Sequence, residues 1–255
     1  MALFGLPQPS LEPDWSPDDA VLATAEIGAE SVTIRNVRNI SYRTKTDYDV
    51  HYYDKTFDLA KLESVWYMVE PFGLFTVGTA HTLVSFGFSD GEYVAISVEI
   101  RKKRGKQFSR LKSILRPYRL HYVIADERDV IGLRTNYRHH AVYLYPMQAS
   151  KGAAHRLFIS MLERANALAT TPEYFNLFTN NCTTNLVAHV NALAPGRIPR
   201  SFRIALPAYS DTLAQQIGLI DQPLSIKALR ARYHINERAL RYAEDPHFSE
   251  RIRGL

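Results

Sequence analysis

The sequence has one cysteine, Cys182, among its 255 residues. A lone cysteine excludes an internal disulfide, and one thiol is too few to hold a structural zinc ion. We therefore expect neither a metal nor a cofactor. Two roles remain for Cys182: it is a catalytic nucleophile, or it is a small buried hydrophobe, which is a common role for free cysteines.

The sequence also lacks a long hydrophobic run, because no apolar stretch approaches the roughly 20 residues that cross a membrane. Its first residues, Met-Ala-Leu-Phe-Gly-Leu-Pro, lack the charged and apolar regions of a signal peptide. Two explanations stay open. Either the protein is cytoplasmic, or an N-terminal export signal or membrane anchor is missing from this chain.

Acidic residues are absent from one strongly basic stretch. From Arg101 to Arg119 the chain carries nine basic residues and no acidic one. Such a block favours an anionic partner, and we expect its first residues to bind phospholipid headgroups: Arg101, Lys102, Lys103, Arg104 and Lys106. A solvated loop explains the same run without a ligand. Nucleic acid is disfavoured, because the sequence shows no helix-turn-helix, zinc or aromatic nucleic-acid motif.

The spacing of apolar residues predicts a mixed α+β architecture, in which an antiparallel sheet packs on helices. Strands are expected over residues 32–37, 65–69, 82–88, 92–100, 120–125, 130–134 and 141–145, with a turn at 126–129. Helices are expected over residues 150–169, after Cys182, over 212–217 and within 226–253. We divide the chain into an extended, loosely held leader (1–25), a catalytic domain (26–221) and a helical C-terminal extension (222–255).

The clearest element is a hairpin around Ser89-Asp90-Gly91, where a type I turn closed by a left-handed Gly91 predicts a three-residue loop. This turn makes paired residue numbers sum to 180. His81 then falls opposite Glu99 on the same face of the sheet, where the two side chains can touch. A two-residue turn would place them on opposite faces, so the pairing depends on the turn type.

The segment before Cys182 is typical of a helix start. Asn180 and Asn181 precede the cysteine and an apolar-periodic run follows it, so an asparagine caps the helix and Cys182 lies in its first turn. The unpaired backbone N–H groups and the positive end of the helix dipole favour a thiolate there. We expect these N–H groups, supported by Asn181, Asn180 and Thr183, to stabilise an oxyanion.

A cysteine nucleophile needs a base, and histidine suits that role near neutral pH. Of the nine histidines, His81 begins a predicted strand with Glu99 as its predicted neighbour, and His121 is its only rival on a strand. His189 lies about two turns beyond Cys182 on the same helix, too far along the axis to reach the thiol. A surface His–Glu pair without a catalytic role is the alternative interpretation of His81 and Glu99.

Two segments carry a resemblance: His81 to Phe88, with the sequence HTLVSFGF, and Asn180 to Asn185, with the sequence NNCTTN. Together they resemble the Lnb N-terminal periplasmic domain family, bacterial proteins related to a lipoprotein N-acyltransferase, from about Val32 to Asp221. More distantly, the order His, acid, Cys is similar to that of circularly permuted papain-like enzymes such as the NlpC-type amidase relatives and lecithin retinol acyltransferase.

The resemblance implies Cys182 as nucleophile and His81 as base, while Glu99 as third member follows from the hairpin register alone. It implies a thiol acyltransferase that takes an acyl group from a phospholipid or other acyl lipid and passes it to an amine, such as that of a lipoprotein, at a membrane surface. Family members usually begin with an anchor or signal, so a periplasmic, membrane-anchored full-length protein is expected.

Two other functions use the same sequence features. A cysteine hydrolase of the amidase or peptidase type needs the same Cys-His-Glu site and differs only in using water as the acceptor. A non-enzymatic basic module that binds a membrane surface needs only the basic stretch, with Cys182 as a packing residue. The sequence does not specify the oligomeric state.

Overall fold

The computed structural model describes residues 14–72, 78–105, 118–220 and 223–255. These residues form a mixed sheet of eight strands in the order β1-β2-β9-β8-β7-β6-β10, with β5 paired to the other edge of β2. The strands of this sheet are β1 (Thr24–Ile27), β2 (Ser31–Arg38), β5 (Tyr52–Asp58), β6 (Leu62–Pro71), β7 (Ala80–Phe88), β8 (Tyr93–Arg101), β9 (Arg119–Ala125) and β10 (Tyr143–Pro146). A separate two-stranded sheet joins β3 (Ser41–Tyr42) to β4 (Tyr48–Asp49).

The pairing in the large sheet is antiparallel except between β2 and β9, which run parallel within the described part of the chain. The β7–β8 hairpin has the predicted register, because Leu83 pairs with Ser97 and Val84 with Ile96. Gly91 has a φ of 83°, the left-handed conformation that the three-residue loop requires. The turn therefore sets which residues of β7 and β8 share a face.

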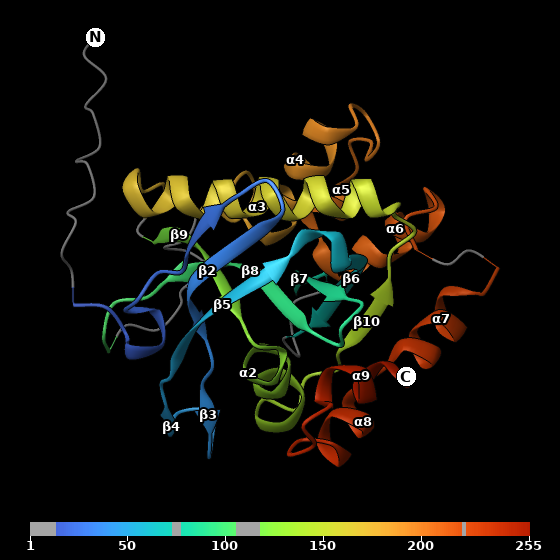
Figure 1. The fold of residues 1–255 in the computed structure, drawn as a ribbon. Coiled ribbons are helices and arrows are strands. Elements are labelled where there is room, and N and C mark those ends of the chain that lie inside the picture. Colours follow the sequence, from blue (N-terminus) through green and yellow to red (C-terminus); the bar gives the residue numbers. More distant parts are fainter. Residues whose placement is uncertain (1–13, 73–77, 106–117, 221–222) are drawn as a thin grey trace, which may run out of the picture.

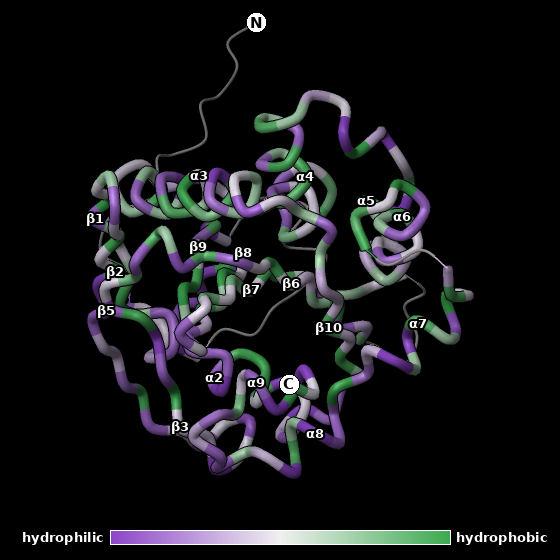
Figure 2. The backbone as a smooth tube through the Cα atoms, turned by 45° about the vertical axis from the view of Figure 1, so that its right-hand side comes forward, coloured by the Kyte–Doolittle hydropathy of each residue, from purple (hydrophilic) through white to green (hydrophobic). Residues whose placement is uncertain are grey.

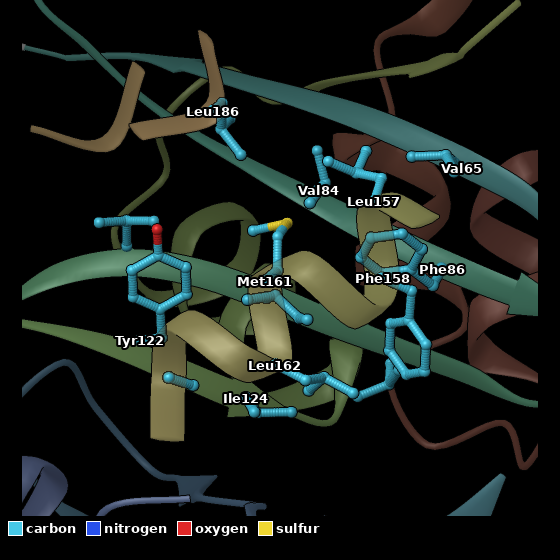
Figure 3. Packing of buried hydrophobic residues seen from close by; sticks show 14 of the residues in the cluster. Val65, Val84, Phe86, Tyr122, Ile124, Leu157, Phe158, Met161, Leu162 and Leu186 are labelled. Atoms are coloured by element: carbon cyan, nitrogen blue, oxygen red, sulfur yellow. The ribbon is translucent and has the colours of Figure 1, made fainter. Parts of the chain in front are cut away.

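One face of the sheet is covered by the two longest helices, α3 (Lys151–Thr170) and α4 (Cys182–Leu193) (Figure 1). Ser150 caps α3 as predicted, because its hydroxyl accepts from the Ala153 N–H. Phe158 of α3 is fully buried and packs against Phe86 (Figure 3). Its ring centroid lies 4.8 Å from that of Phe86 and 5.9 Å from that of Phe88. Each large apolar side chain buried in this way contributes roughly 1.5–3 kcal/mol.

The opposite face is covered by α2 (Glu127–Gly132), η3 (Leu133–Tyr137), α8 (Asn236–Arg241) and α9 (Phe248–Arg253). Figure 2 shows hydrophobic residues gathered on the central strands between these two helical layers. Buried residues of the C-terminal helices, Ile235, Ala239, Phe248 and Ile252, pack with Leu83 and Ala95 of the hairpin. The predicted C-terminal extension is helical, and it forms part of the core.

One predicted strand is wrong. Residues 130–134 were expected as a strand after a turn at 126–129, but the chain there forms α2 and the π-helical turn η3. The Asp126 carboxylate accepts from the Arg128 N–H and caps α2. The supposed turn residues are therefore a helix start, and the apolar side chains that follow face the sheet from a helix.

Residues 14–25, which we placed in a loosely held leader, pack against the sheet. They contain η1 (Pro17–Asp19) and the first residues of β1, and Asp19 is 1% exposed. The remaining elements are η2 (Leu59–Lys61), α5 (Phe202–Ala205), η4 (Pro207–Tyr209), α6 (Ser210–Gln216) and α7 (Ile226–Tyr233). The sheet packed on helices confirms the predicted α+β class.

Candidate active site at the start of α4

Cys182 is the first residue of α4 and is 8% exposed. Asn181 caps this helix with a capping box: its side chain accepts from the Thr184 N–H, and the Thr184 hydroxyl accepts from the Asn181 N–H. The cap predicted from the sequence is confirmed. The cap serves the Thr184 N–H, so the N–H groups of Cys182 and Thr183, which have no acceptor within the helix, lie next to the sulfur.

The two asparagines before the cysteine are held by the backbone. The Asn181 amide donates to the Leu177 carbonyl at 2.6 Å, while its oxygen serves the cap. Asn180 donates to the Tyr174 carbonyl and accepts from the Asn185 amide. Their amide groups are therefore engaged in positioning the helix start, and Thr183 is similarly engaged with Thr82, whose hydroxyl lies 3.1 Å from its own.

His81 is the second residue of β7, and it lines the same cleft as Cys182. Burial raises the pKa of the Cys182 thiol, but His81 and hydrogen bonds from Thr82 lower it more, and the pKa is about 7. A pKa below that of a free cysteine, about 8.5, leaves a large thiolate fraction at neutral pH. The structure brings these two predicted residues together.

Ser97 lies between His81 and Glu99, and the sequence analysis did not single it out. Its hydroxyl oxygen is 2.7 Å from His81 Nε2 and 2.8 Å from Glu99 Oε1, whereas His81 Nε2 and Glu99 Oε1 are 3.8 Å apart. Ser97 is fully buried. Its position two residues before Glu99, on the same face of β8, is the signal that a register argument offers for finding it.

The hydrogen bonds of Ser97 assign the His81 tautomer. Burial raises the pKa of Glu99, but Arg134 and His81 hold it well below its ordinary value, so the carboxylate is ionised. An ionised carboxylate only accepts hydrogen bonds, so the Ser97 hydroxyl donates to Glu99 and accepts from His81 Nε2–H. In the neutral imidazole, Nδ1 is then unprotonated and able to accept a proton from the thiol.

A buried ion network lies behind Glu99. Arg134, from the π-helical turn η3, donates to Glu99 Oε1 at 2.9 Å and to Glu70 Oε2 at 2.7 Å. His140 Nδ1 lies 2.7 Å from the other Glu70 oxygen. Arg134 is 2% exposed and Glu70 1% exposed, so the guanidinium compensates one fully buried carboxylate, Glu70, and a second, Glu99, whose side chain is 21% exposed at the cleft.

The cleft that contains Cys182 and His81 has a volume of about 450 Å³. This is within the range of roughly 300–1,000 Å³ that is typical of small-molecule sites. Its polar residues include Glu70, Glu99, Lys102, Arg138, His140 and Asn181. Its apolar residues include Phe72, Val98, Ile100, Phe175, Leu177, Phe178, Leu206 and Pro207. The lining of the cleft therefore combines charged and apolar side chains.

The other histidine candidates have structural environments of their own. His121 on β9 is 4% exposed, with Nε2 3.4 Å from Asp19 Oδ1, and burial lowers its pKa to about 3. His189 lies between Tyr122 and Ser160, 2.8 Å from each hydroxyl. Neither residue lines the cleft of Cys182.

The first basic residues of the 101–119 stretch contact the leader. Arg101 donates to the Asp19 and Ala20 carbonyls and lies over the Trp15 ring. Lys102 Nζ is 2.8 Å from Asp18, and Arg104 Nε is 3.0 Å from Asp14. Lys103 is exposed, and Lys106 lies outside the described residues. The leader supplies carboxylates and carbonyls that a sequence pattern does not place next to these cations.

The described residues offer neither a membrane-crossing helix nor a metal site. No helix in the described ranges combines the length and apolar character that a membrane crossing requires. Among the described residues, no three His, Cys, Asp or Glu side chains are grouped so as to hold a metal ion.

A comparison with known protein families shows which family this chain belongs to. The Lnb N-terminal periplasmic domain family matches residues 48–212, more than half of the chain. The chain belongs to this family. Both segments that carried the resemblance, around His81 and around Cys182, lie inside the match. No curated protein and no solved structure matches the chain.

Membership in the Lnb N-terminal periplasmic domain family confirms the family expected from the sequence and supports a periplasmic location. The matched region also includes the elements that form the site. It spans most of the sheet, α3, α4 and the cleft, whereas β1, β2, α7, α8 and α9 lie outside it.

Proposed function

We propose that this protein is a cysteine-dependent acyltransferase that forms an acyl-thioester on Cys182 from a lipid donor and passes the acyl group to an amine, such as that of a lipoprotein. The observation that carries the proposal is a thiol with a pKa of about 7 at a helix start, beside His81, in a cleft lined in part by apolar side chains. A buried packing cysteine has no need of such surroundings.

In the proposed mechanism His81 Nδ1 takes the proton of the Cys182 thiol, while Nε2–H is held by Ser97 and, through it, by Glu99. The thiolate attacks the carbonyl carbon of an ester, and the carbonyl oxygen becomes an oxyanion. The Cys182 and Thr183 N–H groups are placed to stabilise that charge. His81 then returns the proton to the leaving alcohol as the ester C–O bond breaks. An amine attacks the thioester carbonyl and loses a proton to His81, and the C–S bond breaks to give the amide and the Cys182 thiolate, which takes the proton back from His81.

The apolar side chains in the lining of the cleft support an acyl chain as the bound part of the donor. A second cavity lined by Tyr67, Thr183, Leu186 and other apolar residues has a volume of about 60 Å³. That volume holds a few water molecules at most, so the larger cleft is the better acyl site. Because the proposed donor is a lipid, we also propose that the full-length protein is held at a membrane.

A cysteine hydrolase is the second candidate, because water in place of the amine needs no change in the site. The chain order His81, Glu99, Cys182 and the position of the cysteine at the start of a helix support a permuted papain-like arrangement, which serves both reactions. The apolar side chains in the lining of the cleft favour the acyl-lipid reaction. A non-enzymatic role would leave the low thiol pKa without a use.

The first test is the rate of Cys182 alkylation by iodoacetamide from about pH 5 to about pH 9. We expect a midpoint near pH 7 in the wild type. His81→Ala removes the group that lowers the Cys182 pKa, so burial raises that pKa and the midpoint of alkylation moves to higher pH. The alkylation rate at pH 7 then falls roughly tenfold or more. His51→Ala, an exposed histidine, is the control and should behave as the wild type. Equal profiles in all three proteins would mean that the site is not catalytic.

A second test separates transfer from hydrolysis. The protein is incubated with phospholipid vesicles, and intact mass spectrometry detects an acyl adduct on the wild type. The adduct is a thioester, so Cys182→Ser cannot form it. Addition of a lipoprotein-like peptide with a free amino terminus should discharge the adduct onto the peptide. Discharge at the same rate with and without the peptide, giving free fatty acid, would identify a hydrolase.

A further inference from the structure

Large aromatic side chains are exposed beside the mouth of the cleft. Phe178 is 56% exposed and itself lines the cleft. Phe202, which is 67% exposed, opens α5, and the residues that follow it, from Ala205 to Pro207, line the cleft. Phe178 in the lining of the cleft and Phe202, three residues before the lining residue Ala205, both face water and are available for an apolar contact.

The charge of the surrounding segment has one sign. From Tyr174 to Ser210 the chain has no acidic residue, and it has three arginines, Arg197, Arg200 and Arg203. Arg197 donates to the carbonyls of Ile217 and Gly218, whereas Arg200 is exposed. Arg203 lies over the Phe202 ring, 5.6 Å from its centroid. Exposed aromatic rings and arginines without acids are complementary to an anionic lipid surface.

We infer that a rim formed by Phe178, Arg200, Phe202 and Arg203 binds the surface of an anionic phospholipid bilayer and turns the cleft toward it. The inference rests on the proposed function for the lipid donor and adds the route by which the donor arrives. The phenylalanines enter the boundary between headgroups and acyl chains, and the arginines contact lipid phosphates. An acyl chain then reaches the apolar side chains in the lining of the cleft without crossing water.

This rim differs from the basic stretch that begins at Arg101. Arg101 donates to backbone carbonyls of the leader, and the charges of Lys102 and Arg104 are partly neutralised by Asp18 and Asp14. The described residues 101–105 of that stretch include no large apolar residue, and residues 106–117 lie outside the described residues. The rim combines both features that interfacial binding needs, and it adjoins the cleft.

The test is sedimentation with phosphatidylcholine vesicles prepared with and without phosphatidylglycerol. Phe202→Ser should lower the partition coefficient roughly tenfold, because it removes one large apolar group from the interface. Leu240→Ser is the matched control, because Leu240 is 68% exposed on α8, away from the cleft. A loss in Leu240→Ser equal to that in Phe202→Ser, or an unchanged partition coefficient in Phe202→Ser, would overturn the inference.

The charge contribution is tested with Arg200→Gln and Lys103→Gln. We expect Arg200→Gln to lower binding roughly fivefold on phosphatidylglycerol vesicles and little on phosphatidylcholine alone. If Lys103→Gln lowers vesicle binding more than Arg200→Gln does, the membrane contact lies on the basic stretch and the inference about the rim is wrong. Phe202→Trp, with quenching by brominated lipid and Leu240→Trp as control, reports whether residue 202 enters the acyl region. Absence of quenching in Phe202→Trp would also count against the rim.

The test of the rim and the test of the proposed function can succeed or fail independently. Cys182 alkylation in solution, without vesicles, tests the thiol site alone. If Cys182 alkylation depends on His81 while Phe202→Ser leaves vesicle binding unchanged, only the inference about the rim is wrong. If vesicle binding depends on Phe202 while Cys182 is unreactive, the rim stands and the chain is a membrane-binding module. Vesicle binding that no rim substitution changes would place the membrane contact elsewhere and overturn the rim.

Discussion

The side chains of Ser97 and Glu99 lie on the same face of β8, and the Ser97 hydroxyl lies between the Glu99 carboxylate and the His81 imidazole. The direct His81–Glu99 separation of 3.8 Å is too long for a strong hydrogen bond, whereas both Ser97 contacts are below 3 Å. At the scale of single residues, the carboxylate therefore acts on the histidine through the hydroxyl. Glu99 is in turn held ionised by Arg134.

Ser97→Ala should remove the acceptor of His81 Nε2–H and free the ring to turn away from the thiol. Since a hydrogen bond of this kind is worth about 1 kcal/mol, we expect roughly fivefold slower Cys182 alkylation at pH 7 and a midpoint shifted to higher pH. Ser97→Thr keeps the hydroxyl and should restore the profile. Ser85→Ala, also fully buried on the hairpin, is the control. A normal alkylation profile in Ser97→Ala would show that Ser97 is structural only.

At the scale of elements, the start of α4 and the turn η3 supply the groups that the strands cannot. The capping box of Asn181 fixes the first turn of α4, so the Cys182 sulfur and the adjacent N–H groups have a defined direction. η3 is a π-helical turn, a rare geometry that often occurs at functional sites, and it carries Arg134 to both Glu70 and Glu99. Both elements are short and depend on neighbours for their stability.

Asn181→Ala removes the cap of α4 and should lower the free energy of unfolding by about 0.5–2 kcal/mol, measured by urea denaturation. Asn181→Asp keeps an acceptor for the Thr184 N–H and should stay closer to the wild type in stability. Its carboxylate beside the sulfur raises the Cys182 pKa, so alkylation at pH 7 slows. Ser225→Ala removes the cap of α7 and should cost stability without changing Cys182. Faster alkylation in Asn181→Asp would contradict this account.

At the scale of the whole molecule, the sheet is buried on both faces, and the C-terminal helices supply much of the second cover. Arg253 of α9 forms a fully buried pair with Glu127 of α2, 2.6 Å apart. Its guanidinium also lies 4.0 Å from the Tyr93 ring centroid and 4.7 Å from that of Trp66. One side chain therefore ties the last helix to the sheet and to α2.

Arg253→Met leaves Glu127 buried without a partner and should lower the free energy of unfolding at pH 7 by about 3–5 kcal/mol. Burial raises the Glu127 pKa and Arg253 lowers it more, so the wild-type pair contributes stability at neutral pH that is lost as the pH falls through the folded pKa. In the variant the Glu127 pKa is raised instead. The stability difference should thus narrow as the pH is lowered from 7 toward 4.

Urea denaturation at several pH values measures this difference. Arg35→Met breaks an exposed pair with Glu26 and is the control, with little change expected at any pH. A constant difference across pH would mean that the loss comes from packing of the Arg253 side chain rather than from the charge of Glu127.

Local signals determined the parts of the fold and site that were predicted. The hairpin register follows from Gly91 and the alternation of β7 and β8, because a short loop and period-two burial leave one pairing. The caps at Ser150 and Asn181 follow from side chains that bond to backbone within three residues. Because these interactions are close in sequence, the order of the residues is enough to predict that Cys182 begins a helix and that His81 and Glu99 share a face.

Long-range contacts decided the rest. Residues 130–134 are helical because their apolar side chains pack on the sheet with the C-terminal helices, and a short apolar run is compatible with either structure. The partners of Arg101 and Lys102 come from a leader more than 80 residues earlier. The bridging role of Ser97 depends on distances of a few tenths of an ångström. Only the tertiary structure decides such matters, because they depend on which distant groups share a buried space.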